Sequence, residues 1–285
     1  MPFVEHQNSL IHFRADGAGA PVVALHGSAS SGYQWESLTG YIAGRHRVVR
    51  PDLPGYGKSA PLAAAQMSLP AMVTRLAAVF REIGEPFHLV GHSFGGAVAL
   101  KVAQTMPHMV RSLVVIEPAA FHLLAEDLAD RPYLNPLAAV ADAMRADRAT
   151  GDDDTAMARF IDFWNGDGAW ASTSQGLRDK LLTTLPQVIA DFTAIASERA
   201  TFADYAQIAC PVLAVTGRQS PAVTQHLTER LARHLPTAEL AEIADAGHMA
   251  PLTDPHVIDP MIARHVQAAE RREARACRHH YCEAA

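Results

Sequence analysis

The chain of 285 residues is 49% hydrophobic and 19% charged, with a formal net charge of −6 at neutral pH. This size and composition predict one large domain, or a domain with an insertion, that buries a substantial core. The acidic balance argues against nucleic acid as a partner, because phosphate binding requires clustered lysine and arginine. The sequence has no apolar run near the ~20 residues of a transmembrane helix and no secretory signal. We therefore expect a cytoplasmic protein that does not bind membranes.

The three cysteines fit a reducing compartment, where structural disulfides are rare. Cys210 opens an apolar run and is expected to be a core residue. Cys277 and Cys282 lie in the C-terminal run CRHHYC, where His279 and His280 could join them as metal ligands. Four ligands in so short a run are too crowded for the paired spacing of a tetrahedral site, so we expect no metal and a solvated terminus.

Short apolar runs alternate with helical patterns along the chain, an order that is typical of a parallel sheet with crossover helices. The predicted strands are, in chain order, residues 21–25, 46–50, 86–90, 110–116, 211–216 and 238–243. The predicted helices cover residues 68–83, which end before Gly84, residues 94–106, and a C-terminal segment that begins at Pro255 or Pro260. The pattern therefore predicts an α/β fold with helices on both faces of a mostly parallel sheet.

Residues 119–205 break this alternation, since they contain several helical stretches and no clear strand. A connection of this length is normally a functional lid or an inserted subdomain. We therefore predict a core domain of residues 1–118 and 206–285 with a helical lid at 119–205. The lid has 14 acidic and 7 basic side chains, a formal charge of −7. Most of its large aromatic residues are expected to form its own core: Phe160, Phe163, Trp164, Trp170, Phe192 and Phe202.

The run GHSFGG at residues 91–96 is the strongest chemical signal, because it matches G-x-S-x-G between a predicted strand and a predicted helix. In such a turn the serine is held in a strained conformation at the tip, and Gly91 and Gly95 let the backbone pack closely around it. The helix that follows directs its positive dipole end at the same point. We therefore predict Ser93 as a nucleophile; the simpler alternative is an ordinary glycine-rich turn.

A second signal is His26-Gly27-Ser28, which follows the first predicted strand. A tetrahedral acyl-transfer intermediate needs two N–H donors directed at its oxyanion. One comes from the residue after the nucleophile, Phe94, and the other from the loop after this earlier strand. We predict the backbone N–H of Ser28 for the second role, with Ala29 as the next choice, and expect His26 only to bond loop backbone.

A third signal is Ala246-Gly247-His248-Met249, directly after the last predicted strand. A serine hydroxyl is a weak nucleophile until a positioned imidazole removes its proton. The chain has 15 histidines, but His248 combines a glycine-flanked loop with a position late enough for the order serine, acid, histidine. We therefore predict His248 as the general base for Ser93.

Together with the run DLPGYGKS at residues 52–59, these motifs resemble the α/β-hydrolase superfamily over about residues 9–270. The resemblance implies an eight-stranded-type, mostly parallel sheet, a triad of serine, acid and histidine, and an inserted helical cap. It implies a structural role for Asp52, whose run contains Gly55 and Gly57 for tight turns.

The position of the triad acid departs from the common pattern of that superfamily. Many members carry the acid a few residues after the strand that here is residues 211–216, but this loop has Ser220 at the position. Some members place the acid one strand earlier, where this chain has Glu117. A carboxylate there faces the same rim as Ser93, so we predict Glu117 as the triad acid. The alternatives are that Glu117 only bonds loop amides and that Asp245 is the acid.

The motifs predict a serine hydrolase that cleaves a carboxylic ester of a small, largely apolar substrate through an acyl-enzyme, with no cofactor. Hydrolysis of a lactone, an amide or a carbon–carbon bond by the same triad is an alternative, and so is a small-molecule receptor of this fold. A dehalogenase of similar fold is excluded, because it requires an aspartate where this chain has Ser93. The sequence does not fix the acyl group, the alcohol or the oligomeric state.

Overall fold

The computed structural model describes the backbone of residues 2–6, 9–125 and 127–283. It describes their side chains except those of residues 6, 64 and 277–283. The cysteine and histidine side chains of the C-terminal run, Cys277, His279, His280 and Cys282, therefore lie outside the described residues. Among the described residues, no group of three or more histidine, cysteine and acidic side chains is arranged to hold a metal ion.

An eight-stranded sheet forms the centre of the protein, in the order β1-β2-β4-β3-β5-β6-β7-β8. Strands β3 to β8 run parallel to one another, whereas β1 and β2 are antiparallel to their neighbours at one edge. The strands are β1 (Phe3–His6), β2 (Ser9–Asp16), β3 (Ala20–Leu25), β4 (His46–Pro51), β5 (Phe87–His92), β6 (Val110–Ile116), β7 (Val212–Gly217) and β8 (Ala238–Ile243). The predicted mostly parallel sheet is confirmed, with six predicted strands close to their expected positions.

The two N-terminal edge strands were not predicted. Strand β2 buries only Ile11, His12 and Phe13 among its eight residues, so its apolar signal is short and is interrupted by a histidine. His12 is accommodated because its Nδ1 bonds Asp52 Oδ2 at 2.8 Å. The edge therefore depends on a tertiary contact that no local pattern displays.

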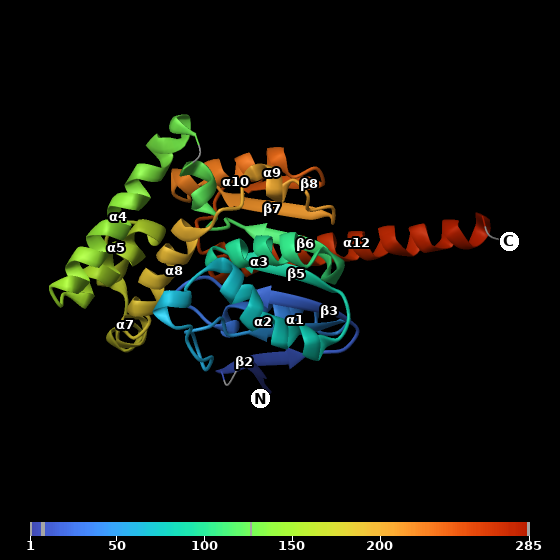
Figure 1. The fold of residues 1–285 in the computed structure, drawn as a ribbon, viewed down its shortest axis with the longest axis horizontal. Helices are drawn as coiled ribbons and strands as arrows, with labels where there is room; N and C mark the ends of the chain where they lie inside the picture. Colours follow the sequence, from blue (N-terminus) through green and yellow to red (C-terminus); the bar gives the residue numbers. More distant parts are fainter. Residues whose placement is uncertain (1, 7–8, 126, 284–285) are drawn as a thin grey trace.

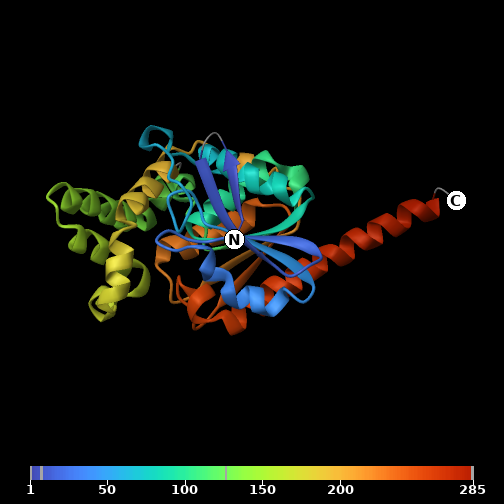
Figure 2. The same ribbon diagram turned by 90° about the horizontal axis from the view of Figure 1, so that it is seen from below.

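Helices cover both faces of the sheet (Figure 2), with α2 (Leu69–Ile83), α3 (Phe94–Thr105) and α10 (Ala222–His234) on one face and α1 (Glu36–Ile42) and α12 (Pro255–Glu283) on the other. Successive side chains of a strand point to opposite faces. In β3, Val23 and Leu25 join the first core, while Val22 and Ala24 join the second. Burial on both faces explains why the parallel strands are nearly continuous apolar runs.

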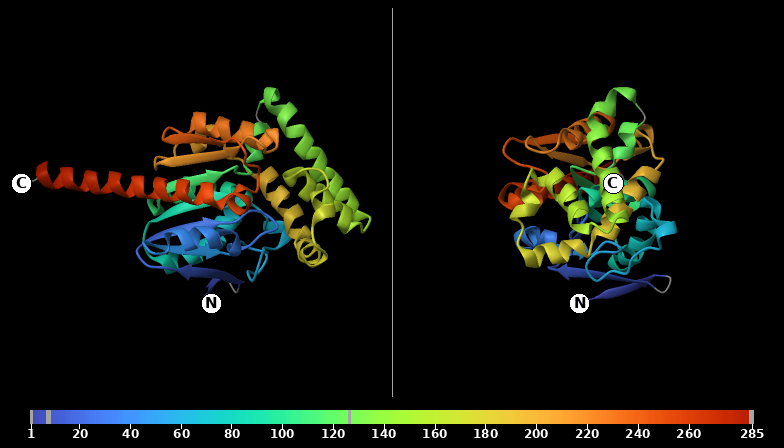
Figure 3. Two further views of the ribbon diagram at one scale, coloured as in Figure 1. Left: turned by 180° about the vertical axis from the view of Figure 1, so that it is seen from behind. Right: turned by 90° about the vertical axis from the view of Figure 1, so that its left-hand side faces the viewer.

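Between β6 and β7 the described elements are all helical: η4 (Phe121–Ala125), η5 (Leu128–Asp130), α4 (Arg131–Ala149), α5 (Asp153–Asn165), α6 (Ala169–Ser172), α7 (Gln175–Leu182), α8 (Leu185–Ser197) and α9 (Phe202–Tyr205). We call residues 119–205 the helical insertion. Its longer helices gather at one end of the sheet, and α12 projects beyond the opposite end (Figures 1 and 3). Helix α12 begins at Pro255, so that Pro260 lies inside it.

Close packing of α3 against β3 predicts a sharp difference between two glycine substitutions. A Cβ on Gly95 would lie 2.4 Å from the carbonyl oxygen of His26 and 2.5 Å from that of Leu25. We expect Gly95→Ala to lower the thermal midpoint by roughly 2–10 °C, since overpacking costs about 1–3 kcal/mol. Gly40 in α1 is exposed with no atom within 4 Å of its added Cβ, so Gly40→Ala should leave the midpoint unchanged or raise it slightly. Equal midpoints in a calorimetric comparison would contradict this packing.

Candidate active site

Ser93 lies at a tight turn between β5 and α3. Its backbone has φ of 53° and ψ of −121°, a conformation that costs free energy for a residue other than glycine. The turn is possible because its neighbours lack side chains: a Cβ on Gly91 would lie 2.4 Å from the carbonyl oxygen of Gly95. The strained turn is what the G-x-S-x-G pattern predicts for a nucleophile.

The side chains of Ser93, His248 and Glu117 form a hydrogen-bonded chain. His248 Nδ1 lies 2.7 Å from Glu117 Oε2, and His248 Nε2 lies 3.1 Å from Ser93 Oγ. An ionised carboxylate can only accept, so the Nδ1–H of His248 donates to Glu117. The Nε2 atom is then the free acceptor and can take the Ser93 proton.

Glu117 follows β6 and is buried, with 1% of its surface exposed. Its other oxygen, Oε1, accepts from Thr216 Oγ1 at 2.9 Å and from the Gly217 N–H at 2.8 Å. Burial opposes ionisation, but the hydrogen bond and charge of His248 outweigh it and hold the pKa of Glu117 at about 2. Ionised Glu117 thus contributes stability in full above its ordinary pKa of 4.5, and this contribution is lost progressively as the pH falls from there through about 2.

Two other positions bear on the identity of the acid: Asp245, which is the alternative acid, and Ser220, which occupies the usual position of the acid. Asp245 follows β8 and is exposed, whereas Glu117 is buried against the His248 ring. Ser220 is buried in the loop after β7, but a hydroxyl cannot compensate the charge of an imidazolium as a carboxylate does. The geometry therefore places Glu117, of the three, against the imidazole.

The predicted oxyanion donors lie next to Ser93. Phe94 is the first residue of α3, and the first N–H groups of a helix have no intrahelical acceptor. Ser28 and Ala29 line the same cavity as Ser93. The residues other than glycine with positive φ in the described chain are Ala29, Ser93 and Glu117, and all three border this site. Strain gathered at one place is typical of a functional site.

His26 and His92 hold the loops around Ser93 as neutral rings. His26 Nδ1–H donates to the Gly27 carbonyl at 2.7 Å, and its Nε2 accepts from the Leu53 N–H at 2.9 Å. His92 Nε2–H donates to the His248 carbonyl at 2.8 Å. Burial lowers the pKa of His26 to about 4 and that of His92 to about 3, so both rings are uncharged at neutral pH. His26 thus bonds loop backbone, as expected.

Gln34 completes a bridge that the sequence did not reveal. Its Oε1 accepts from the Gly27 N–H at 3.1 Å, and its Nε2 donates to His92 Nδ1 at 3.2 Å. Since His92 in turn bonds the His248 carbonyl, one chain of hydrogen bonds joins the loops of Gly27, Ser93 and His248. Gln34 lies on a short 3-10 helix, η1 (Gly32–Trp35), and carries no motif that could have indicated this role.

Trp164 was expected in the core of the lid, but it also meets the predicted base. Its ring stacks on His248 with centroids 4.3 Å apart and planes at 26°. Phe121 and Phe160 contact it from within the helical insertion. The helical insertion thus places an aromatic face directly against the imidazole of His248.

The cavity in front of Ser93 has a volume of about 580 Å³. The described residues that line it include no lysine or arginine. Most of its wall is apolar and is formed by Phe160, Ile161, Trp164, Leu177, Leu181 and Leu252. Such a cavity suits a small ligand of mainly apolar surface.

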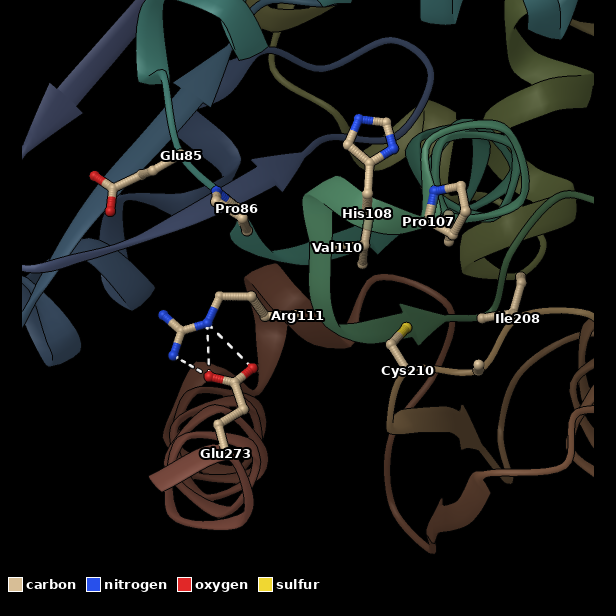
Figure 4. A pocket seen from close by; sticks show the side chains of 11 residues that line it. Glu85, Pro86, Pro107, His108, Val110, Arg111, Ile208, Cys210 and Glu273 are labelled. Atoms are coloured by element: carbon tan, nitrogen blue, oxygen red, sulfur yellow. Dashed lines mark hydrogen bonds and ion pairs between the residues drawn. The ribbon is translucent and has the colours of Figure 1, made fainter. Parts of the chain in front are cut away.

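A second cavity, of about 660 Å³, lies away from Ser93 (Figure 4). In it Arg111 Nε donates to Glu273 Oε2 of α12 at 3.0 Å. Cys210 borders it, and burial raises the pKa of this thiol to about 11, so the thiol is protonated and unreactive at neutral pH. Ser93 and His248, the predicted nucleophile and base, line the smaller cavity, which is the candidate active site.

No described helix is long and apolar enough to cross a membrane. The predicted cytoplasmic setting stays a prediction.

Comparisons with known proteins agree with this geometry. The family described as alpha/beta hydrolase fold matches residues 20–255. The chain is 35% identical to lipase LipV of Mycobacterium tuberculosis over 50% of its own length and 55% of that lipase. It is 29% identical to the pimeloyl-[acyl-carrier protein] methyl ester esterase of Methylococcus capsulatus, over 85% of this chain and 93% of that esterase.

A solved structure shares the fold over nearly the whole chain. The esterase EaEST of Exiguobacterium antarcticum superposes with a TM-score of 0.75 at 18% identity, covering 93% of this chain and 98% of that one. The family match covers the parallel strands β3 to β8, the turn at Ser93 and the loop of His248. The chain therefore belongs to the α/β hydrolase fold family and is a hydrolase.

Proposed function

We propose that the protein is a serine hydrolase that cleaves uncharged carboxylic esters with small, largely apolar acyl and alcohol groups. The observation that carries the proposal is the hydrogen-bonded chain from Glu117 through His248 to Ser93, at the base of an apolar cavity. The sequence similarity to a methyl ester esterase supports ester cleavage. Each chemical step uses protein groups and water.

In the first half of the reaction Ser93 Oγ attacks the ester carbonyl while His248 Nε2 removes its proton. The negative charge that develops on the carbonyl oxygen is stabilised by the backbone N–H groups of Ser28 and Phe94. His248 then gives the proton to the departing alkoxide, which leaves as the alcohol, and Ser93 carries the acyl group as an ester. In the second half a water molecule repeats the attack with the help of His248 and releases the carboxylic acid.

Glu117 keeps the Nδ1 proton in place, so that Nε2 faces Ser93, and its negative charge compensates the imidazolium of His248. Because the pKa of Glu117 is held at about 2, the carboxylate is charged throughout the neutral range.

The character of the cavity favours neutral substrates. An anionic group inside it would lose hydration without gaining a cationic partner from the described lining residues. The helical insertion adds a formal charge of −7, which repels anions weakly because exposed charges are screened within ~10 Å at moderate salt.

The helical insertion serves as the lid of this cavity. Residues from its α5 and α7, among them Phe160, Trp164 and Leu181, form the wall opposite Ser93. Its helices exclude water from the oxyanion and select the substrate by shape. The core domain of residues 1–118 and 206–285 supplies the nucleophile, the base, the acid and the oxyanion donors.

Replacement of the nucleophile tests the proposal directly. We expect Ser93→Ala to abolish hydrolysis of p-nitrophenyl butyrate while the circular dichroism spectrum and thermal midpoint stay close to those of the wild type. A fluorophosphonate probe should label the wild type at Ser93 and leave the variant unlabelled, as read by mass spectrometry. Labelling at another residue, or unchanged turnover in the variant, would refute the assignment.

The buried carboxylate gives a second test. We expect Glu117→Gln to lower kcat on the order of 10²- to 10⁴-fold at neutral pH, because an amide cannot compensate the imidazolium. The amide oxygen can still accept from Thr216 and Gly217, so the variant should fold, with a thermal midpoint lowered by the loss of the charged contact with His248. Ser220→Ala is the matched control and should cost about fivefold or less, the effect of one weak hydrogen bond of roughly 1 kcal/mol. Near-wild-type kcat in Glu117→Gln would show that Glu117 is not the acid.

Two esters of similar length test the charge preference of the cavity. We expect kcat/KM for p-nitrophenyl butyrate to exceed that for the anionic p-nitrophenyl hemisuccinate by about tenfold or more, because the carboxylate finds no cationic partner. Leu252 lines the cavity and is 50% exposed, so Leu252→Arg should narrow this ratio without unfolding the protein. A wild-type preference for the hemisuccinate would contradict the proposed substrate class. A parallel lactone and amide substrate test the alternative reactions.

A further inference from the structure

Asp191 of α8 makes a buried contact between the helical insertion and the core. Its Oδ2 atom accepts from Ser28 Oγ at 2.6 Å and from Tyr56 Oη at 2.5 Å. Its Oδ1 atom accepts from Gln187 Nε2 at 2.9 Å, one turn earlier on the same helix. Asp191 is 2% exposed, so these hydrogen bonds form away from solvent.

These contacts converge on the loop that carries the proposed oxyanion donor. Ser28 contributes its hydroxyl to Asp191 and its backbone N–H to the proposed oxyanion hole. The phenol of Tyr56 donates to the same carboxylate oxygen at 2.5 Å and so holds Asp191 from the side of the core. Ala29 has φ of 56°, a strained conformation that must be held by its surroundings. One carboxylate oxygen thus bonds Ser28, directly beside this strained residue.

Simple packing does not explain a carboxylate at this position. The three groups that donate to Asp191 are neutral, so the hydrogen bonds compensate its charge only in part. Burial accordingly raises the pKa of Asp191 to about 7. An apolar side chain would fill the space without this cost, and buried ionisable groups with such costs are concentrated at functional sites.

We propose that Asp191 is a positioning residue of the oxyanion hole: it holds the Ser28–Ala29 loop so that the Ser28 N–H points at the developing oxyanion. Because Asp191 belongs to α8, the hole is complete only while the helical insertion is docked on the core. This inference rests on the proposed function and adds to it a dependence of the chemical step on the insertion.

Substitution of Asp191 tests this role through the chemical step. We expect Asp191→Ala to lower kcat for p-nitrophenyl butyrate about 10- to 100-fold, the effect of a small misplacement of a catalytic group, with KM within about twofold. The Ki of an alkylboronic acid, whose adduct with Ser93 imitates the tetrahedral intermediate, should rise by a similar factor. A contact that only supported the fold would lower the thermal midpoint without this selective loss.

The Asp191→Asn variant keeps the hydrogen bonds to the loop but removes the charge, so it separates the positioning role of Asp191 from the effect of its charge. Both Ser28 and Tyr56 donate to one oxygen of Asp191, so the amide oxygen of Asp191→Asn can accept both. Gln187 can turn its amide to accept from the new NH₂ group. We expect kcat within about threefold of the wild type. If Asp191→Ala does not fold, Asp191→Asn and Ser28→Ala are used for the test instead. We expect Ser28→Ala to lower kcat and to raise the Ki of the boronic acid by similar factors.

Asp130 provides a matched control. It is also a buried carboxylate of the helical insertion, 2% exposed, and it bonds the core helix α10 through His226 at 2.7 Å and through Arg230. It lies outside the cavity of Ser93. Asp130→Ala should therefore lower the thermal midpoint while kcat and boronic acid affinity stay at wild-type values.

The outcomes separate the two proposals. Wild-type kcat and boronic acid affinity in Asp191→Ala, or in Ser28→Ala when that variant is used, would overturn the positioning role and leave the proposed function intact. An equal loss of kcat in Asp130→Ala, or a loss in Asp191→Asn as deep as in Asp191→Ala, would also overturn it. Fluorophosphonate labelling away from Ser93 would overturn the proposed function itself.

Discussion

The geometry of the site depends on one strained turn, in which Ser93 joins β5 to α3 with φ of 53°. Its backbone is held on both sides by the loop of the acid: the Ser93 N–H donates to the Ile116 carbonyl at 3.0 Å, and the Ser93 carbonyl accepts from the Ala119 N–H at 2.9 Å. Glu117 lies between these two anchors. The parallel sheet makes this possible, because the carboxyl ends of β5 and β6 are neighbours. Two backbone hydrogen bonds thus hold the strained turn of Ser93 against the loop that carries Glu117.

Three histidines around this turn have different tasks because their ring partners differ. His26 and His92 bond backbone or amide groups through both nitrogens and are neutral by burial. They act as rigid links between loops. His248 has a carboxylate on one side and the Ser93 hydroxyl on the other, so it is the ring that can accept a proton with its charge compensated. The different hydrogen-bond partners of the three rings, and not the residue type, therefore decide which histidine can act as a base.

The helical insertion contributes to the site at two points beyond its role as a wall. Trp164 of α5 stacks on His248, and Asp191 of α8 bonds the Ser28 hydroxyl. The first contact concerns the base and the second the loop of the oxyanion donor. In the mechanism that we propose, movement of the insertion would change proton transfer and oxyanion stabilisation together and would link access of substrate to the chemical step.

The sequence by itself determined those features that depend on residues close together along the chain. The apolar strands, the G-x-S-x-G turn and the glycine-flanked His248 were sufficient to predict the α/β fold and a hydrolase, both of which are confirmed. Because Ser220 occupies the position where the acid is common, the sequence predicts Glu117 as the acid. In the structure Glu117 Oε2 lies 2.7 Å from His248 Nδ1, and its catalytic role stays a prediction.

Only the tertiary structure decided which distant side chains meet. Asp191 lies 163 positions from Ser28 and 135 from Tyr56, and Gln34 lies 58 from His92. No helical or strand period encodes such contacts, because they arise where separate loops converge at the carboxyl edge of the sheet. The sequence did not predict the edge strands β1 and β2 for a related reason, since β2 contains a buried His12 whose Nδ1 is bonded by the distant Asp52. Local periodicity specifies which elements form, whereas long-range packing specifies which polar groups they bring together.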